Sequence, residues 1–290
     1  MGTYQIAGVG FRIIPPAGRS FSLQTDFDDD SEGCFLHKFK AELNPAIPSF
    51  LCEYDDEASV YIPPPTFLIR ERALTVAEDE DYYYLPDDLN EEGIVNYNIR
   101  YRKDFHHALI TRHCARNLFP SLALRTVFRN FALAHQIVEI HAAAIEYDGG
   151  AILFSGFSGV GKSTHVNLWQ EKYHVPVLNG DSPLVRTGKA PMVCGSPWCG
   201  TSRQTLNHEL PLRAVVFIEQ AAVNEISRLS GSEAFMRLVS VAGIPRWNTE
   251  RMNLGLDCLT QMIESTPVYL LRCRPDWQAV EIVKKELDDQ

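Results

Sequence analysis

The sequence predicts a mixed α/β fold in which a smaller, β-rich domain precedes a larger domain built on a mixed sheet. Three observations predict this. Strand-like runs of β-branched and aromatic residues dominate the first third of the chain. A glycine-rich loop later in the chain lies between an apolar run and a helical stretch, and a tight-turn signal directly precedes that run. The 290 residues are 45% hydrophobic and 22% charged, an ordinary globular composition for one large or two modest domains.

The first third of the chain is expected to be strands and loops. Residues 3–14 and 67–78 have the composition of strands, and Tyr82 to Tyr84 and Asn96 to Arg102 suggest two more. Proline pairs and an acidic stretch interrupt these runs, as turns and loops do. We interpret the three consecutive tyrosines as packing residues of a strand rather than as a ligand-binding box.

Charge divides the chain near Asp104. Residues 1–104 hold 9 basic and 20 acidic side chains, a net charge of −11, whereas residues 105–290 hold 18 and 17, a net charge of +1. We therefore predict two domains with these boundaries. The acidic surface disfavours nucleic-acid binding, which needs lysine and arginine to neutralise phosphates. A solvated surface is the simpler interpretation, and the alternative is that the first domain recognises a basic partner, the acceptor of the reaction proposed below.

The larger domain is expected to open with a helix and a hairpin. From Pro120 to about Val138 the apolar spacing suits an amphipathic helix begun by proline. His141 to Tyr147 suggests a short strand, Asp148-Gly149 is a tight-turn signal, and Ala151 to Phe154 suggests a buried strand. A hairpin therefore leads into the glycine-rich loop.

That loop, Gly156 to Ser163, satisfies the phosphate-binding pattern GxxxxGK[ST] at every required position. Its glycines let successive backbone N–H groups face the phosphates of ATP or GTP, and Lys162 would reach the β and γ phosphates. The Ser163 hydroxyl would bind Mg²⁺, and a helix over 164–172 would present its positive end to the phosphates. The predicted nucleotide-binding residues are Gly156, Ser158, Gly159, Val160, Gly161, Lys162, Ser163 and Thr164.

Three further residues are candidates for chemistry. Asp181 follows the apolar run Val175 to Leu178, so it is expected at a strand end, where it could accept a proton from an acceptor hydroxyl and bind metal. The alternative is a solvent-facing aspartate in an Asn-Gly-Asp turn. Glu219 ends an apolar strand and is either a metal ligand or an ordinary strand-end acid. His141 either orients Asp181 or contacts a phosphate, or else it is a core histidine.

The ordered set of motifs over residues 119 to 276 resembles the HPr kinase/phosphorylase superfamily, including its small peptide-modifying relatives, and more distantly the ATP-dependent phosphoenolpyruvate carboxykinases. Besides His141 and the phosphate loop, the resemblance rests on four segments: Asn179-Gly180-Asp181, Gly195 to Thr201, Pro211 to Glu219, and Leu271 to Asp276. It implies an α/β P-loop domain of that type with a mixed sheet, and an ATP-dependent kinase with Asp181 as the catalytic carboxylate. Residues 1–104 lie outside the resemblance.

Two positions depart from that family. HPr kinases have two adjacent aspartates where this chain has Gly180 before Asp181, and they have an acidic residue before an Arg-Gly signature where this chain reads Pro191 to Gly195. The resemblance therefore implies neither phosphorylase activity nor HPr itself as the acceptor.

Several side chains are secondary candidates. The guanidinium groups of five arginines could bind a phosphate or a carboxylate of the substrate, namely Arg203, Arg246, Arg251, Arg272 and Arg274. Trp198 and Trp247 are expected to pack near the site rather than to stack on adenine. Gly195 to Thr201, rich in turn-forming residues, is predicted to be a mobile substrate loop.

The remaining features favour a cytoplasmic protein. Seven scattered cysteines contain no CxxC pair, which disfavours a zinc site or a disulfide framework. No signal peptide and no stretch of 18 apolar residues is present, so we expect neither export nor a membrane span. The oligomeric state stays open, a homo-oligomer included.

The predicted function is a kinase that transfers the γ-phosphoryl group of ATP to a hydroxyl of a small protein, a peptide or a small molecule. A carboxykinase-like lyase is one alternative, although the chain is short for it and lacks a dense set of basic and metal-binding residues. A non-catalytic nucleotide sensor or scaffold is the other, and the presence of Lys162, Ser163 and Asp181 argues against it.

Overall fold

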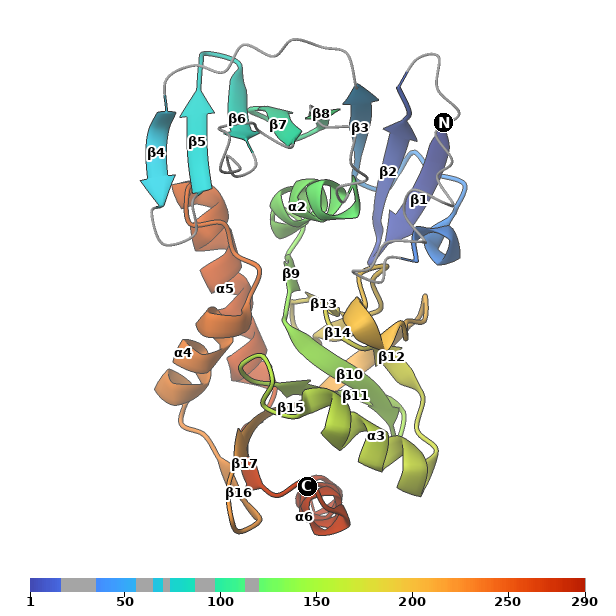
Figure 1. Cartoon of the computed structure of the whole chain (residues 1–290), viewed down its shortest axis with the longest axis vertical. Coiled ribbons are helices and arrows are strands. Elements are labelled where there is room, and N and C mark those ends of the chain that lie inside the picture. The colour runs from blue at the N-terminus through green and yellow to red at the C-terminus, as the bar shows by residue number, and fades with distance from the viewer. Residues whose placement is uncertain (17–34, 56–64, 70–73, 87–96, 113–119, 290) are drawn as a thin grey trace.

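The protein contains two mixed β-sheets that lie one above the other, with helix α2 between them (Figure 1). The computed structural model describes residues 1–16, 35–55, 65–69, 74–86, 97–112 and 120–289. The mixed α/β class expected from the sequence is present. Within the described residues, no helix combines the length and the apolar character needed to cross a membrane.

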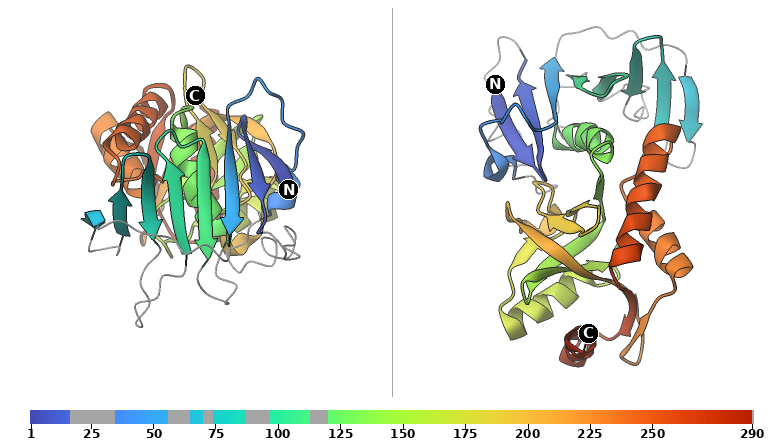
Figure 2. Two further views of the ribbon diagram at one scale, coloured as in Figure 1. Left: turned by 90° about the horizontal axis from the view of Figure 1, so that it is seen from above. Right: turned by 180° about the vertical axis from the view of Figure 1, so that it is seen from behind.

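The first sheet has eight strands in the order β1-β2-β3-β8-β7-β6-β5-β4, seen face-on from above in Figure 2. The β2–β3 and β3–β8 pairs are parallel, and the other neighbours are antiparallel. A short 3-10 helix, η1 (Leu36–Phe39), precedes β3. The strands are β1 (Gly2–Ile6), β2 (Val9–Ile14), β3 (Ser49–Asp55), β4 (Pro65–Ile69), β5 (Leu74–Glu78), β6 (Tyr82–Pro86), β7 (Tyr97–Arg102) and β8 (His107–Arg112).

Strands are present over the described parts of the predicted runs, whereas residues 70–73 and 96 lie outside the described residues. The first sheet does not end at residue 104. That boundary lies between β7 and β8, which pair with each other in register from Tyr97↔Arg112 to Tyr101↔Ala108. The compositional change near Asp104 therefore marks a hairpin turn, in which Phe105 has a φ of 60°, rather than the edge of the sheet.

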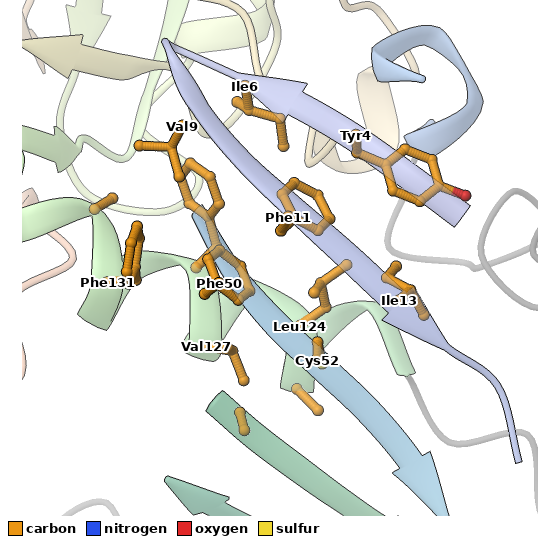
Figure 3. Packing of buried hydrophobic residues seen from close by; sticks show 14 of the residues in the cluster. Tyr4, Ile6, Val9, Phe11, Ile13, Phe50, Cys52, Leu124, Val127 and Phe131 are labelled. Atoms are coloured by element: carbon orange, nitrogen blue, oxygen red, sulfur yellow. The ribbon is translucent and has the colours of Figure 1, made fainter. Parts of the chain in front are cut away.

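One hydrophobic core joins the first sheet to α2 (Pro120–Leu133). Phe11 on β2 stacks on Phe50 of β3, with ring centroids 5.2 Å apart, and Phe50 packs against Phe131 of α2 at 5.0 Å (Figure 3). Phe128 on the same helix contacts Trp198 at 5.5 Å, a residue from the second half of the chain. The first sheet thus shares a core with the rest of the protein.

The second sheet has the order β12-β10-β11-β15-β14-β13-β9, and β17 joins it by pairing with β15 and β16. The β11–β15 and β15–β17 pairs are parallel and the remaining pairs are antiparallel. Its strands are β9 (Ile137–Glu139), β10 (Ala142–Tyr147), β11 (Gly150–Ser155), β12 (Val177–Asn179), β13 (Leu184–Arg186), β14 (Met192–Cys194), β15 (Glu209–Gln220), β16 (Glu225–Arg228) and β17 (Val268–Cys273).

Helices cover both faces of this sheet. On one face α3 (Lys162–Tyr173) and α6 (Trp277–Asp288) bury Trp169, Val280 and their neighbours against it. On the other face α4 (Gly231–Val241) and α5 (Thr249–Ser265) bury Leu238 and Leu259. Figure 1 and the rear view in Figure 2 show α5 running from the second sheet toward the first, along one side of the molecule.

Local signals in the sequence place most of these boundaries. Asp148 and Gly149 have φ values of 50° and 71°, the left-handed conformation that a two-residue hairpin between β10 and β11 requires. Ser230 and Glu233 form a reciprocal capping box that starts α4. The helix expected over 120–138 ends earlier, at Leu133, because Gln136 has a φ of 58° and the chain then enters β9.

Candidate functional site

The phosphate-binding pattern forms a tight loop between β11 and α3. Gly156, Gly159 and Gly161 have φ values of 144°, 79° and 110°, conformations that a residue with a Cβ rarely adopts. A Cβ on Gly156 would also lie 3.0 Å from the carbonyl oxygen of Ile218 on β15. The strand, loop and helix expected from the sequence are therefore present, with the N-terminus of α3 at the end of the loop.

Lys162 folds back over this loop. Its Nζ donates hydrogen bonds to the carbonyl oxygens of Gly156 at 3.0 Å and Phe157 at 3.3 Å. Burial lowers the pKa of Lys162, and the carboxylate of Asp181 acts against this effect. Ser163 and Thr164 are exposed in the first turn of α3, where the Ser163 hydroxyl is accessible to a ligand.

Two cavities adjoin the loop. One of about 460 Å³ is bounded by residues 156–160 of the loop, 217–220 of β15 and the end of α4, including Arg237 and Val241. The other, of about 420 Å³, lies between Gly159 to Gly161, Thr164 and the segment from Cys273 to Pro275. The volume of each falls within the range of small-molecule sites.

Asp181 and His141 face each other close to this loop. The Nδ1 of His141 lies 3.3 Å from Oδ1 of Asp181, and both side chains are partly exposed. Burial lowers the pKa of His141 despite the attraction of the neighbouring carboxylate, and Lys162 and Arg125 lower it further. The structure therefore brings the side chains of two of the predicted residues close together.

A second set of contacts, which the sequence analysis missed, supports Asp181 from the other side. Oδ2 of Asp181 accepts a hydrogen bond of 2.6 Å from the Ser182 hydroxyl. Arg125 donates to the same hydroxyl, and its Nη2 lies 3.9 Å from Oδ2 of Asp181. Arg125 also forms a two-pronged ion pair with Glu139, at 3.0 and 2.8 Å. Burial alone would raise the pKa of Glu139. The positive charges of Arg125 and Arg129 outweigh this effect and lower that pKa, so the carboxylate stays ionised.

Asn179 fixes the turn that carries Asp181. Its Oδ1 accepts hydrogen bonds from the backbone N–H groups of Asp181 at 2.9 Å and Ser182 at 2.7 Å. Its Nδ2 donates to the carbonyl oxygens of Ser196 at 2.9 Å and Trp198 at 3.2 Å. The side chain is fully buried, so this turn is held by the interior of the protein and not by solvent.

The expectation of a mobile substrate loop over Gly195 to Thr201 is wrong for most of that segment. Residues 195–199 are buried, and the carbonyl oxygens of Ser196 and Trp198 accept hydrogen bonds from Asn179. The glycine and proline residues of this segment therefore allow close packing rather than mobility. Trp198 packs against Phe128 and donates its Nε1–H to the carbonyl oxygen of Ser121, as a packing residue. The turn continues into a 3-10 helix, η3 (Gly200–Ser202).

Two glycines, Gly180 and Gly200, explain why Asp181 has no second acidic residue directly before it. A Cβ on Gly180 would lie 1.8 Å from the Ser202 hydroxyl, so an aspartate at this position has no room beside η3. Gly200 has a φ of 61°, and a Cβ there would meet Cβ and Cγ of Asp181 at 2.8 and 3.0 Å. Gly200 therefore lets the backbone lie directly against Asp181, and the adjacent pair of acids typical of HPr kinases is sterically excluded here.

Glu219 lies beside the phosphate loop, but it is already paired. Oε1 accepts a hydrogen bond of 2.7 Å from Arg237, and Oε2 lies 3.4 Å from Nε of Arg272. Arg237 first, then Arg272, lower the pKa of Glu219. In this arrangement the carboxylate binds two cations of the protein rather than facing a metal, because Arg237, a residue that sequence reasoning missed, reaches it from α4.

The five candidate arginines do not form one cluster. Arg203 lies over the ring of Phe35, and Arg251 is 6% exposed with its guanidinium 4.2 Å from the ring centroid of Phe105. Arg272 binds Glu219. Arg274 lines the second loop cavity and pairs with Asp276 at 2.9 Å.

Arg246 is exposed and lines a separate cavity between α2 and the segment after α4, and Trp247 lies in its wall. Trp247 also packs edge-on against Tyr83, with ring centroids 5.2 Å apart, as the expectation of a packing residue required.

No group of three or more histidine, cysteine, aspartate or glutamate side chains gathers at metal-binding distance within the part of the chain that the structure describes. A metal at this site would therefore depend on Ser163, Asp181 and the phosphates of a nucleotide. Mg²⁺ commonly binds in this way, through one or two protein ligands, phosphates and water.

Comparisons with known proteins give similarity to solved structures but not to protein families. No family model and no curated protein matches the chain. Among solved structures, the chain is similar to the HPr(Ser) kinase/phosphatase from Coxiella burnetii, with a TM-score of 0.28 and 8% sequence identity over 52% of this chain and 93% of that one. At this level of similarity we infer function from the site itself.

Proposed function

We propose that this protein is an ATP-dependent phosphotransferase that phosphorylates a hydroxyl group. The observation that carries the proposal is the position of Asp181: its Oδ1 lies 3.3 Å from Nδ1 of His141, and its carboxylate influences the pKa of Lys162 in the phosphate loop. A carboxylate beside the cation of a nucleotide-binding loop is the arrangement that proton abstraction from an acceptor hydroxyl requires.

The residues present fit ATP and Mg²⁺. The glycine conformations of the loop, the adjacent cavities of about 460 and 420 Å³ and the exposed first turn of α3 suit a bound triphosphate. Ser163 and Asp181 would hold Mg²⁺, which neutralises charge on the phosphates when bound. Glu219, engaged by two arginines, would not need to contribute.

In the proposed reaction, Asp181 accepts the proton of the acceptor hydroxyl while the hydroxyl oxygen bonds to the γ-phosphorus. The bond from that phosphorus to the β–γ bridging oxygen breaks, and ADP leaves. Lys162 neutralises charge on the transferring group. Protein side chains supply mainly position and charge, which is where most of the barrier reduction in phosphoryl transfer arises.

The surrounding side chains keep Asp181 ready as a base. Oδ2 of Asp181 accepts a hydrogen bond from the Ser182 hydroxyl, and Oδ1 lies 3.3 Å from Nδ1 of His141, so protein groups lie against both oxygens of the carboxylate. A carboxylate has about four lone-pair sites, so one stays available for the acceptor hydroxyl. Nη2 of Arg125 lies 3.9 Å from Oδ2 of the same carboxylate.

Transfer of labelled γ-phosphate from ATP to candidate hydroxyl acceptors tests the proposal. We expect a stable phosphate ester and stoichiometric ADP with the parent protein, and loss of both with Asp181→Asn. If ATP binds but label appears in no acceptor of protein, peptide or small-molecule type, the protein is a nucleotide sensor. Oxaloacetate-dependent consumption of ATP would instead identify a lyase.

A further inference from the structure

A third cavity, of about 290 Å³, lies where α2 meets the segment that follows α4. It includes two arginines and no acidic residue in its wall. The residues that form it are Leu85, Thr126, Arg129, Asn130, Ala242, Gly243, Ile244, Pro245, Arg246 and Trp247. Its volume is at the lower limit for small-molecule sites, so its ligand would be a small compound rather than a folded protein.

The charge of this cavity favours an anion. Arg246 is exposed and has no ion-pair partner among the residues that the structure describes. Arg129 approaches Glu139 at 3.5 Å, but that carboxylate is bound more closely by Arg125, at 2.8 Å. Two guanidinium groups and one already engaged carboxylate leave a net positive wall, and guanidinium groups bind carboxylates and phosphates in two-pronged fashion.

A polar group in the same wall also lacks a partner. Asn130 is 3% exposed, and its Nδ2 donates to the carbonyl oxygen of Thr126 at 2.9 Å. Its Oδ1 has no hydrogen-bond partner among the described residues. Buried amide oxygens are nearly always satisfied, so a donor group on a bound molecule would complete this one after a small adjustment.

The cavity adjoins the phosphate loop through the backbone. The N–H of His141 donates to the carbonyl oxygen of Val241 at 2.8 Å, and the N–H of Gly243 donates to the carbonyl oxygen of Glu139 at 2.8 Å. Val241 borders the cavity at the phosphate loop, and the next residue, Ala242, borders this one. Consecutive residues therefore line the two cavities, and the backbone of His141 is hydrogen-bonded to the first of them, Val241.

Side chains give a second connection to the site. Oε1 of Glu139 lies 3.5 Å from Arg129 and 2.8 Å from Arg125, and Arg125 in turn lies 3.9 Å from Asp181. Gly243 makes room for this arrangement, because a Cβ there would be 2.8 Å from Cδ of Arg129. One continuous network of charged side chains thus runs from Arg129, in the wall of the cavity, to Asp181.

We propose that this cavity binds the anionic group of a small hydroxy compound, a carboxylate or a phosphate, and thereby places the hydroxyl of that compound beside Asp181. The proposal rests on the kinase function proposed above and narrows its acceptor. Oxygen of the bound hydroxyl bonds to the γ-phosphorus of ATP, its proton passes to Asp181, and the products are ADP and a phosphate ester that retains the anionic group.

Three compounds with a hydroxylated three-carbon chain show whether the site prefers a carboxylate, a phosphate or neither: glycerate, glycerol phosphate and the uncharged glycerol. We expect kcat/KM for at least one of the two anions to exceed that for glycerol by about 10- to 100-fold, the effect of one or two charge-assisted hydrogen bonds. Preference for glycerate indicates a carboxylate acceptor, and preference for glycerol phosphate indicates a phosphate. Equal rates for all three compounds overturn the proposal.

Arg246→Gln tests the site directly, with Arg228→Gln, an exposed arginine on β16, as the matched control. We expect Arg246→Gln to raise KM for the preferred anion about tenfold or more with ATP affinity unchanged, and Arg228→Gln to leave both unchanged. Gly243→Ala, which displaces Arg129, should lower the same preference independently. An unchanged preference in both Arg246→Gln and Gly243→Ala refutes an anion site in this cavity.

Binding of glycerate and glycerol phosphate without ATP, measured by calorimetry, separates the two proposals. Binding that Arg246→Gln weakens, with no phosphoryl transfer to any acceptor, supports the cavity and refutes the kinase. Transfer to glycerol or to a protein acceptor that neither variant alters supports the kinase and refutes the cavity. Absence of both binding and transfer to the anions refutes the cavity as an acceptor site.

Discussion

Nδ1 of His141 lies 3.3 Å from Oδ1 of Asp181, although 39 intervening residues, including the whole phosphate loop, separate the two in the chain. Antiparallel pairing of β10 with β12 brings them together, because His141 directly precedes β10 and Asp181 follows β12. Their backbones are joined as well, since the N–H of Ala142 donates to the carbonyl oxygen of Asp181 at 3.0 Å. The sheet therefore holds Asp181 and His141 as a unit.

Asp181→Asn should separate chemistry from nucleotide binding. The amide keeps the shape of the side chain but cannot accept the proton, so we expect turnover to fall by about 10²- to 10⁴-fold with ATP affinity nearly unchanged. Asp257→Asn, on α5 and away from the phosphate loop, is the control and should behave as the parent. Steady-state transfer rates and an ATP titration measure both quantities. Equal turnover in parent and variant would make Asp181 an ordinary turn residue.

Lys162→Ala should abolish most of the affinity for ATP. Its ammonium group is the cation that lies against the phosphate loop, where it now bonds to the carbonyl oxygens of Gly156 and Phe157. Losing two charge-assisted hydrogen bonds to phosphates corresponds to a decrease of about 100-fold or more. Thermal-shift titrations with ATP and Mg²⁺ measure this, and Lys189→Ala, at an exposed bend, is the control. Comparable stabilisation by ATP in all three proteins would exclude this loop as the phosphate site.

The sequence predicted the parts of the structure that depend on neighbouring residues. The hairpin at Asp148-Gly149, the glycine loop and the position of Asp181 after a strand all follow from local patterns, and all are present. For His141 the sequence leaves three alternatives, a partner of Asp181, a phosphate contact or a core histidine, and its Nδ1 lies 3.3 Å from Oδ1 of Asp181. The conformational preferences of neighbouring residues are sufficient to predict the hairpin and the glycine loop.

The sequence did not predict the features that depend on contacts between distant elements. Arg125 on α2 contacts Ser182 and Glu139 across the interface between the two sheets. These partners are 57 and 14 residues away in the chain, so a pattern of neighbouring residues cannot predict the contacts. One signal was available, because Glu139 is an acid within the apolar run Ile137 to Ile140, and a buried acid requires a cationic partner. The predicted domain boundary near residue 104 differs from the structure for a related reason. It was placed by a change in net charge, which reflects surface residues, whereas the extent of the sheet depends on the pairing of β7 with β8.

Acid should weaken the protein through His165. This residue is 3% exposed on α3, accepts a hydrogen bond from Nε1 of Trp169 at 3.1 Å, and burial lowers its pKa to about 4. Because the unfolded chain takes up a proton near pH 6.5 and the folded protein only near pH 4, stability is unaffected above pH 6.5 and falls as the pH decreases between these values. The loss reaches about 3 kcal/mol at pH 4.

The free energy of unfolding, measured with denaturant at about pH 7 and at about pH 4.5, tests this prediction, because most of the expected loss of stability occurs between these two pH values. His165→Gln keeps an acceptor for Trp169 but cannot be protonated, so its free energy of unfolding should depend less on pH than that of the parent. His174→Gln, at the exposed C-terminal end of the same helix, is the matched control and should retain the pH dependence of the parent. An equally steep decline in His165→Gln and the parent would assign the acid sensitivity to other groups.

Gly200→Ala should impair turnover while leaving nucleotide binding intact. A methyl group at this position would lie 2.8 Å from Cβ and 3.0 Å from Cγ of Asp181, so the carboxylate must move away from His141. The same substitution also forces alanine into a φ of 61°, which by itself costs about 1 kcal/mol. Gly149→Ala separates the two effects, since Gly149 has a φ of 71° and no other atom lies within 4 Å of the place that a Cβ would occupy.

Both glycine variants should lose stability in denaturant unfolding because both place alanine in the left-handed region, and Gly200→Ala should lose more because its methyl group also meets Asp181. Turnover should fall about tenfold or more in Gly200→Ala alone, since misplacing a catalytic group by a fraction of an ångström lowers its effectiveness steeply. A parallel loss of turnover in both variants would trace the effect to backbone strain. Full turnover in Gly200→Ala would show that the position of Asp181 does not control the reaction.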